Sequence, residues 1–442
     1  MISACNAKGG PYLSPTRRNS RVEIDDMDDA CSFHCSLADE LMSNQSPPCS
    51  PHGPTLIQYY SPPFTRYILP TIRLLQWSGY YATSLSTCSN YCFWRFCAVA
   101  ILRIALVTYV VANFIPLCLN MWITHSFRQE HGFWHALTIT TIITGTLPLQ
   151  NLLNLLIFSC RIRKHQQLFQ EMNDVCAGYP ILKRFNLRVY ALFLTALLIP
   201  LIMRVIQTCM IPILMEGWLG VATFIMVPML RIWQLIPLIY FATLTSNLTL
   251  WFKALRKQIY NDRLLRKYTL VHYYDQFLKL TSISRRLGGV FNIFVLISLL
   301  FSMVCLCLTI YFVTQADGML KLDFPPNTTA EDRYFERLNL HFDVCWGLLQ
   351  IVISIIYITE ICRIGRRFNE GARSVLTAVL RTNPQTDDDR FQVMKFMQKT
   401  NMQLHWGISI WRAFLIERSL LFTLISTILA YALILNKLKD NR

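Results

Sequence analysis

Seven long apolar runs recur along this chain, and they constrain its fold more than any other feature of the sequence. Each is close to the length of about 20 residues that an α-helix needs to cross roughly 30 Å of hydrocarbon. The chain is 53% hydrophobic and only 15% charged, whereas soluble proteins carry about a quarter charged residues. We therefore predict an all-α, polytopic membrane protein with seven transmembrane helices. The predicted spans are residues 97–124, 134–160, 188–214, 218–247, 289–315, 342–362 and 416–436.

The basic residues predict how the chain crosses the membrane. They gather in the loops after the second, fourth and sixth runs, whereas the alternate loops are short or acidic. Because Lys and Arg are enriched on the cytoplasmic side, the N-terminus should be cytoplasmic and the C-terminus extracellular. Asn327 begins a glycosylation sequon in the longest loop predicted to be external. This orientation is opposite to that of G-protein-coupled receptors, and the chain lacks the two motifs usual in their third and seventh spans.

Three regions differ in composition. Residues 1–65 are rich in Ser, Pro, Asn and Cys, and we predict a disordered cytoplasmic tail. Residues 66–96 are amphipathic and aromatic, which is typical of a segment lying on the inner membrane surface. Residues 97–442 form the predicted seven-helix domain, with cytoplasmic helical extensions at 249–288 and 363–415.

Patterns typical of enzymes and of metal sites are weak. His131 and His135 have the spacing of a helical metal pair, but no acidic residue lies where a third ligand or general base is needed. No nucleophile elbow or phosphate-binding glycine loop occurs. We expect no catalysis, no metal and no cofactor. The net charge of +16 arises from loops beside the membrane, so we expect no nucleic-acid partner either.

Two apolar runs contain the same unusual pair of residues. "LIMRVIQTCM" places Arg204 three residues before Gln207, and "VPMLRIWQLI" places Arg231 three residues before Gln234. Both arginines are roughly 18–22 Å from the turn that joins the two runs, given a rise of about 1.5 Å per residue. Two charges at matched depth, too far from the surface to reach water easily, indicate a cavity.

We therefore predict a polar stimulus pocket that opens to the outside and is bordered by the third and fourth spans. The alternative is that each arginine bonds buried carbonyl groups in a packed bundle. The acidic residues of the other spans lie near span ends, with Asp343 at the outer end of its span. The further candidates for the pocket are Trp233, Trp346 and Gln350.

The last apolar run carries a stripe of small and hydroxylated residues. They recur at spacings of three and four residues, so they share one helix face. Such a stripe suits close helix packing or the wall of an aqueous pore. The stripe consists of Thr423, Ser426, Thr427 and Ala430.

The inverted seven-span topology, the long cytoplasmic stretch before the last span and the closing segment "STILAYALILNKL" resemble the gustatory-receptor family of insects and its nematode relatives. That family's last span carries threonine-tyrosine, five apolar residues, then glutamine-phenylalanine. Tyr431 matches, whereas Ala430, Lys437 and Leu438 depart from the pattern. The architecture fits from about residue 66 to the end, and the departures suggest a divergent branch.

The resemblance implies a homotetrameric cation channel of the plasma membrane of sensory neurons, or a heteromer with related subunits. It implies a ligand pocket within each subunit and a pore lined by the last span, with Tyr431 joining the hydroxylated stripe as pore or gate. Nematode relatives include sensors of short-wavelength light and hydrogen peroxide, so we expect the stimulus to be such a signal, a soluble tastant or an internal ligand. The alternative function is a membrane sensor that signals through a separate partner, a G protein or a downstream channel.

Overall fold

The computed structural model describes residues 63–80, 100–101, 103–111, 136–176, 178–180, 187–210, 217–265, 269–319, 330–382, 384 and 386–440. All of them belong to one compact unit, Tyr60–Arg442. Nearly all of the predicted tail, much of the first predicted span and the sequon at Asn327 lie outside the described residues.

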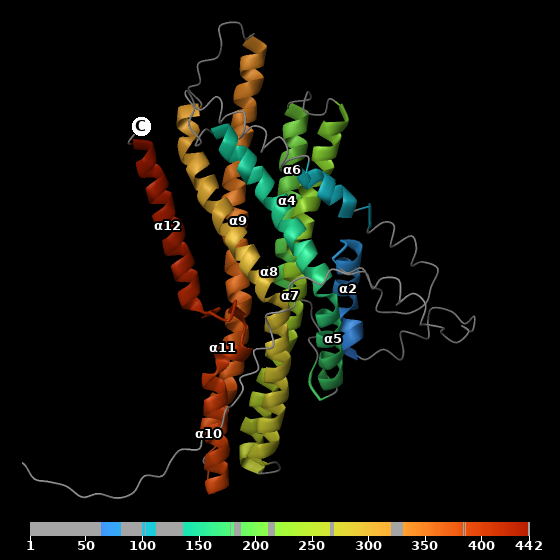
Figure 1. The fold of residues 1–442 in the computed structure, drawn as a ribbon, viewed down its shortest axis with the longest axis vertical. Coiled ribbons are helices and arrows are strands. Elements are labelled where there is room, and N and C mark those ends of the chain that lie inside the picture. The colour runs from blue at the N-terminus through green and yellow to red at the C-terminus, as the bar shows by residue number, and fades with distance from the viewer. Residues whose placement is uncertain are drawn as a thin grey trace, which may run out of the picture. The chain divides into compact units, whose positions relative to one another are not determined.

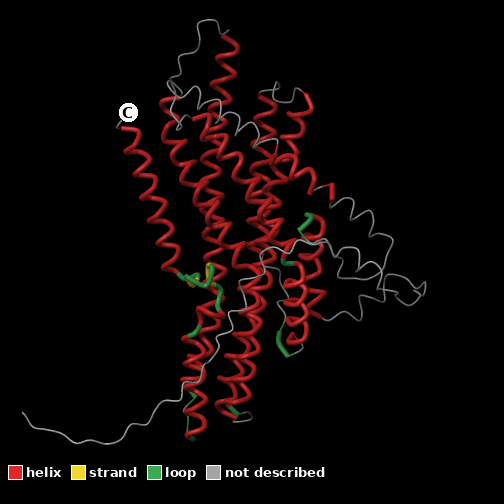
Figure 2. The backbone as a smooth tube through the Cα atoms, in the orientation of Figure 1, coloured by secondary structure: helices red, strands yellow, loops and turns green. Residues whose placement is uncertain are grey.

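The described chain is almost entirely helical, as the all-α prediction requires (Figure 1). Its three longest helices, α7, α8 and α9, have 49, 50 and 51 residues and run side by side (Figure 2). The labelled helices are α2 (Pro63–Trp77), α4 (Ala136–Cys160), α5 (Ile162–Cys176), α6 (Leu187–Met210), α7 (Gly217–Leu265), α8 (Leu270–Met319), α9 (Ala330–Leu380), α10 (Asp387–Asn401), α11 (Gln403–Trp406) and α12 (Arg418–Asp440). Residues 103–111 are helical as well.

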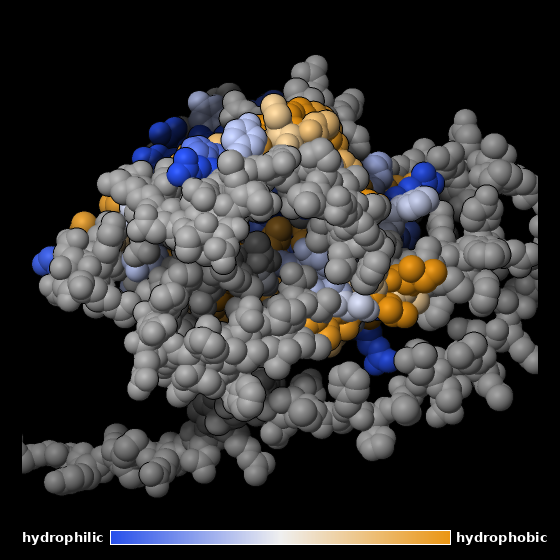
Figure 3. Space-filling view, turned by 90° about the horizontal axis from the view of Figure 1, so that it is seen from above, coloured by the Kyte–Doolittle hydropathy of each residue, from blue (hydrophilic) through white to orange (hydrophobic). Residues whose placement is uncertain are grey.

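Three helical segments among the described residues are long and apolar enough to cross a membrane. They are Phe224–Asp262, Leu270–Thr314 and His341–Leu380, and Leu197–Met210 and Arg418–Ile434 are shorter apolar helices. Large apolar side chains also lie on the outside, among them Ile202 and Phe422, which are 55% and 68% exposed. Hydrophobic patches are visible at the surface in Figure 3. Such exposure suits a lipid environment, whereas the count of seven spans stays a prediction.

A proline within α7 explains how the N-terminal segment attaches to the bundle. Pro237 has no N–H, so the carbonyl of Trp233, four residues earlier, lacks its helical donor. The hydroxyl of Tyr80 donates to that carbonyl at 2.8 Å. The segment after α2 therefore contacts α7 beside the arginine-glutamine pair.

The extension predicted at 363–415 is not helical throughout. After α11 the chain forms a hairpin of β1 (Ser409–Ile410) and β2 (Phe414–Leu415). Trp411 and Arg412 make its turn with φ of 47° and 57°, the left-handed region that interrupts a helix. The helical prediction is wrong here because hydrogen bonds from α9 hold the hairpin, and the local sequence does not reveal them.

Candidate functional site

A cavity of about 250 Å³ lies among α4, α6, α7, α8 and α9. It contains five of the seven residues predicted for the stimulus pocket, and these come from three different helices. The full lining is Tyr109, Ile143, Leu147, Arg204, Gln207, Leu230, Arg231, Thr309, Phe312, Asp343, Trp346, Gly347 and Gln350.

Each arginine bonds the glutamine one helical turn along its own helix. Arg204 Nη1 donates to Gln207 Oε1 at 2.7 Å, and Arg231 Nη1 donates to Gln234 Oε1 at 3.2 Å. Residues three apart share a helix face, so the repeated spacing produces the repeated contact. Arg231 Nη2 also donates to Gln350 Oε1 of α9. Both arginines thus line the predicted cavity. They also bond carbonyl groups, as the alternative proposed, but these carbonyls belong to glutamine side chains.

The α9 residues join the two pairs into one network. Trp346 Nε1 donates to Gln207 Oε1 at 3.2 Å. Gln350 Nε2 lies 3.1 Å from Cys305 Sγ and 3.2 Å from Ser354 Oγ. These groups come from α6, α8 and α9. A ligand that displaced one of these hydrogen bonds would therefore alter contacts of all three helices.

Sequence reasoning missed that Asp343 belongs to this site. Its position at the outer end of a span separated it from the arginines, yet it lines the same cavity as Arg204 and Arg231. Asp343, Trp346 and Gln350 follow one another at three and four residues, so they share one face of α9. This spacing is the feature of the sequence that could have placed Asp343 with Trp346 and Gln350. The packing of α9 on α6 and α7 then brings the carboxylate to the same cavity as the guanidinium groups.

The other two predicted pocket residues do not line the cavity. Trp233 is only 4% exposed, and its indole belongs to the apolar core. Gln234 lies behind Arg231 and donates through Nε2 to Gln150 Oε1 of α4 at 3.4 Å. Asn151, another residue missed from sequence, donates to the carbonyl of Leu230 at 2.8 Å. These buried amides hold α4 against the arginine-bearing turn of α7.

The predicted pore stripe lies on α12. Thr423, Ser426, Ala430 and Tyr431 are exposed in the single chain, and Thr427 is half-buried. The hydroxyls of Thr423 and Thr427 bond carbonyls four residues earlier in their own helix. The stripe is thus free to meet another chain or an aqueous pore.

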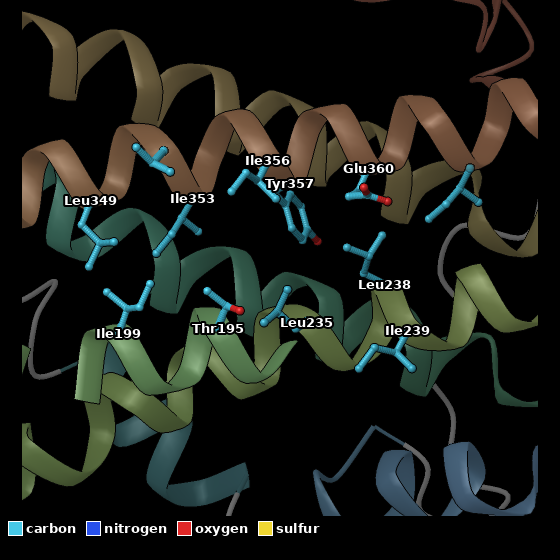
Figure 4. Close-up of a pocket in the computed structure, with 12 residues that line it drawn as sticks. Thr195, Ile199, Leu235, Leu238, Ile239, Leu349, Ile353, Ile356, Tyr357 and Glu360 are labelled. Carbon is cyan, nitrogen blue, oxygen red and sulfur yellow. The ribbon is translucent and has the colours of Figure 1, made fainter. Parts of the chain in front are cut away.

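A second cavity, of about 130 Å³, lies between α6, α7 and α9 and was not expected from sequence (Figure 4). Its wall is formed by aliphatic side chains, with Thr195, Tyr357 and Glu360 as its polar members. Glu360 is paired with Arg363. The described lining of this cavity contains no arginine or lysine, in contrast to that of the first cavity.

Within the described part of the chain, no group of three or more His, Cys, Asp or Glu side chains could hold a metal ion. The polar residues of the larger cavity are hydrogen-bond donors and acceptors around two guanidinium groups. Such an arrangement can bind and orient a small polar molecule.

Comparisons with known proteins indicate a receptor. The chain is 32% identical over 348 residues to "Probable G-protein coupled receptor egl-47" of Caenorhabditis elegans, which covers 76% of this chain and 67% of that protein. Two structures of the olfactory receptor OR5 from Machilis hrabei, one in complex with eugenol, align with TM-scores of 0.61 and 0.57. Both are 14% identical and cover 84% of this chain and 98% of OR5, so they establish similarity of fold. No protein-family model matches the chain.

Proposed function

Because the chain belongs to the family of the nematode receptor egl-47 and shares the fold of an insect olfactory receptor, we propose that it is a stimulus-gated cation channel of the gustatory-receptor type. It responds to a chemical ligand or to short-wavelength light or hydrogen peroxide. It acts in the plasma membrane of a sensory neuron, as a homotetramer or with related subunits.

The observation that carries this proposal is the polar cavity inside the helix bundle. Arg204 and Arg231 come from two neighbouring helices and face one space of about 250 Å³. A charge in the membrane interior is costly, and such residues mark binding sites or ion paths. A ligand there would bond side chains of α6, α7 and α9, and α9 also contacts α12. α9 therefore links the cavity to the proposed pore helix, whose exposed stripe includes Ser426 and Ala430.

Whole-cell current tests the proposal directly. The chain would be expressed alone in a heterologous cell and exposed in turn to ultraviolet light, hydrogen peroxide and a panel of sugars and small organic ligands. A cation current evoked by any of these is expected. Surface-expressed protein that carries no current under every stimulus would contradict a self-sufficient channel.

A second function is supported by the name of the relative, which describes a probable G-protein coupled receptor. Under this alternative the chain senses the stimulus and a separate G protein or channel carries the signal. The same cells distinguish the two functions, because a G-protein response would raise a second messenger and would be blocked by an inhibitor of nucleotide exchange. A channel current would persist under that inhibitor.

A further inference from the structure

We propose that the larger cavity binds a small organic carboxylate and that Arg231 holds the carboxylate group. The inference rests on the proposed function, since it names the ligand class of the same cavity. The guanidinium of Arg231 is a buried charge. Arg231 is 7% exposed, and its hydrogen-bond acceptors are the neutral amide oxygens of Gln234 and Gln350.

No carboxylate of a described residue forms an ion pair with Arg231. A buried charge without a counter-charge destabilises a protein, because amide dipoles replace only part of the lost hydration. The cost is greater still within a membrane. An anion bound beside Arg231 would remove this penalty.

The charges on the cavity wall give the sign of the ligand. Among the described residues that line the cavity there are two guanidinium groups, Arg204 and Arg231, and one carboxylate, Asp343. Asp343 can balance one of them, which leaves one positive charge on the wall. A cationic ligand would add to this excess and a neutral one would leave it, whereas a monovalent anion would balance it.

The chemistry of the guanidinium favours an oxyanion such as a carboxylate over a spherical anion. Arg231 uses Nη1 and Nη2 for its two glutamine partners, and a guanidinium carries five N–H donors in a planar fork. A carboxylate matches this fork with two oxygens in one plane, which a spherical ion such as chloride cannot do.

The size and lining of the cavity favour an organic molecule. An apolar cavity of about 150 Å³ accommodates benzene, so a space of about 250 Å³ is large enough for a ring that carries a carboxylate. Ile143, Leu147 and Phe312 supply an apolar wall, and Trp346 and Tyr109 supply aromatic faces. A single inorganic ion would leave most of this surface without contact.

Binding to the purified full chain in detergent tests the proposal without any measurement of current. Benzoate and its neutral analogue benzamide are titrated in the same buffer, and Tm is followed by tryptophan fluorescence. Benzoate should raise Tm in a saturable manner, and benzamide should not. Arg231→Gln should weaken benzoate binding at least tenfold. Arg161→Gln is the matched control, because Arg161 bonds the carbonyls of Gly289 and Val290 outside the cavity.

A second variant covers the possibility that Arg231→Gln does not fold. Gln350→Glu places an internal carboxylate against Arg231, so this variant should have a higher Tm than the wild type and no longer bind benzoate. Equal shifts with benzamide, saturation by chloride alone, or undiminished benzoate binding to Gln350→Glu would each overturn the proposal. A chain that binds benzoate but carries no current would contradict the channel function and leave the carboxylate site intact.

Discussion

Asn369 and Ile408 are joined by two hydrogen bonds, although 39 residues separate them. Ile408 N–H donates to Asn369 Oδ1 at 3.0 Å, and Asn369 Nδ2 donates to the Ile408 carbonyl at 2.9 Å. The same Nδ2 reaches the carbonyl of Ile416 at 3.3 Å. One side chain of α9 therefore holds both ends of the hairpin that leads into α12.

Replacing this side chain should loosen the hairpin. Asn369→Ala removes the side chain that pairs with the N–H of Ile408 and the carbonyl of Ile416, and each buried group that loses its partner costs about 1–3 kcal/mol. The Ile408 carbonyl keeps the N–H of Ile416 as a donor. We expect the variant to lose roughly 2–4 kcal/mol of stability, measured as a lower Tm of the purified protein. Asn401→Ala is the control, because Asn401 is exposed on α10. Equal Tm values for the two variants would rule out this role for Asn369.

Gly365 permits a close approach between α9 and Ile416, two residues before α12. A Cβ at this position would lie 2.8 Å from the Cβ and Cγ2 of Ile416. Gly365→Ala should therefore cost about 1–3 kcal/mol, as overpacking does, and Ile416→Ala in the same chain should recover part of the loss. Gly289→Ala is the control, since nothing lies within 4 Å of its added Cβ. If the double variant lowers Tm by the sum of the two single effects, the steric clash between the added Cβ of Gly365→Ala and Ile416 is contradicted.

Loss of either cavity arginine should remove the response to the stimulus. Arg204→Ala and Arg231→Ala each delete a donor that lines the cavity, so we expect the evoked current to fall at least tenfold at unchanged surface expression. Current per surface-labelled receptor is the measurement. Arg256→Ala removes an exposed charge of α7 and should respond normally. Normal responses from both cavity variants would exclude this cavity as the stimulus site.

The stripe on α12 can be tested for contact with a pore. A cysteine in place of Ser426 should react with a charged, water-soluble thiol reagent while the channel is open, and the attached charge should block most of the current. Ile425→Cys is the control, because Ile425 is also exposed but lies one position away from the stripe. Equal block at both positions, or at neither, would argue that α12 does not line the pore in this register.

Acid should destabilise the protein through His165 of α5, which follows the second predicted span. Burial, and to a smaller extent the charge of Arg161, lowers the pKa of His165 from 6.5 to about 3. The unfolded chain takes up this proton below its ordinary pKa and the folded chain does not. The stabilising contribution is therefore present above pH 6.5 and is lost as pH falls toward 3.

Between pH 7 and pH 5 the loss should be roughly 2 kcal/mol, given about 1.4 kcal/mol per pKa unit. His165→Phe keeps a ring stacked on Phe158, where the present centroid distance is 4.9 Å. The Tm of this variant should vary less with pH than that of the wild type, whereas His405→Phe, at an exposed position, should keep the wild-type slope. If the Tm of His165→Phe falls with pH as steeply as that of the wild type, a group other than His165 causes the acid sensitivity.

The sequence alone determined the features that depend on local geometry. Apolar runs of helical length predict helices, and the described residues form them. The spacing of Arg204 and Gln207, repeated in Arg231 and Gln234, predicts matched faces at matched depth because the rise and turn of a helix are constant. Trp346 and Gln350, the two candidates from the sixth predicted span, also line the cavity.

Tertiary structure alone decided which side chains from different helices meet. Asp343 joins the arginines because α9 packs on α6 and α7, and Trp233 lies outside the cavity because its side of α7 packs into the core. The hairpin after α11 depends on Asn369, far away in sequence. The relative rotation and register of packed helices follow from the sum of many weak contacts across the bundle, and no local pattern in the chain encodes that sum.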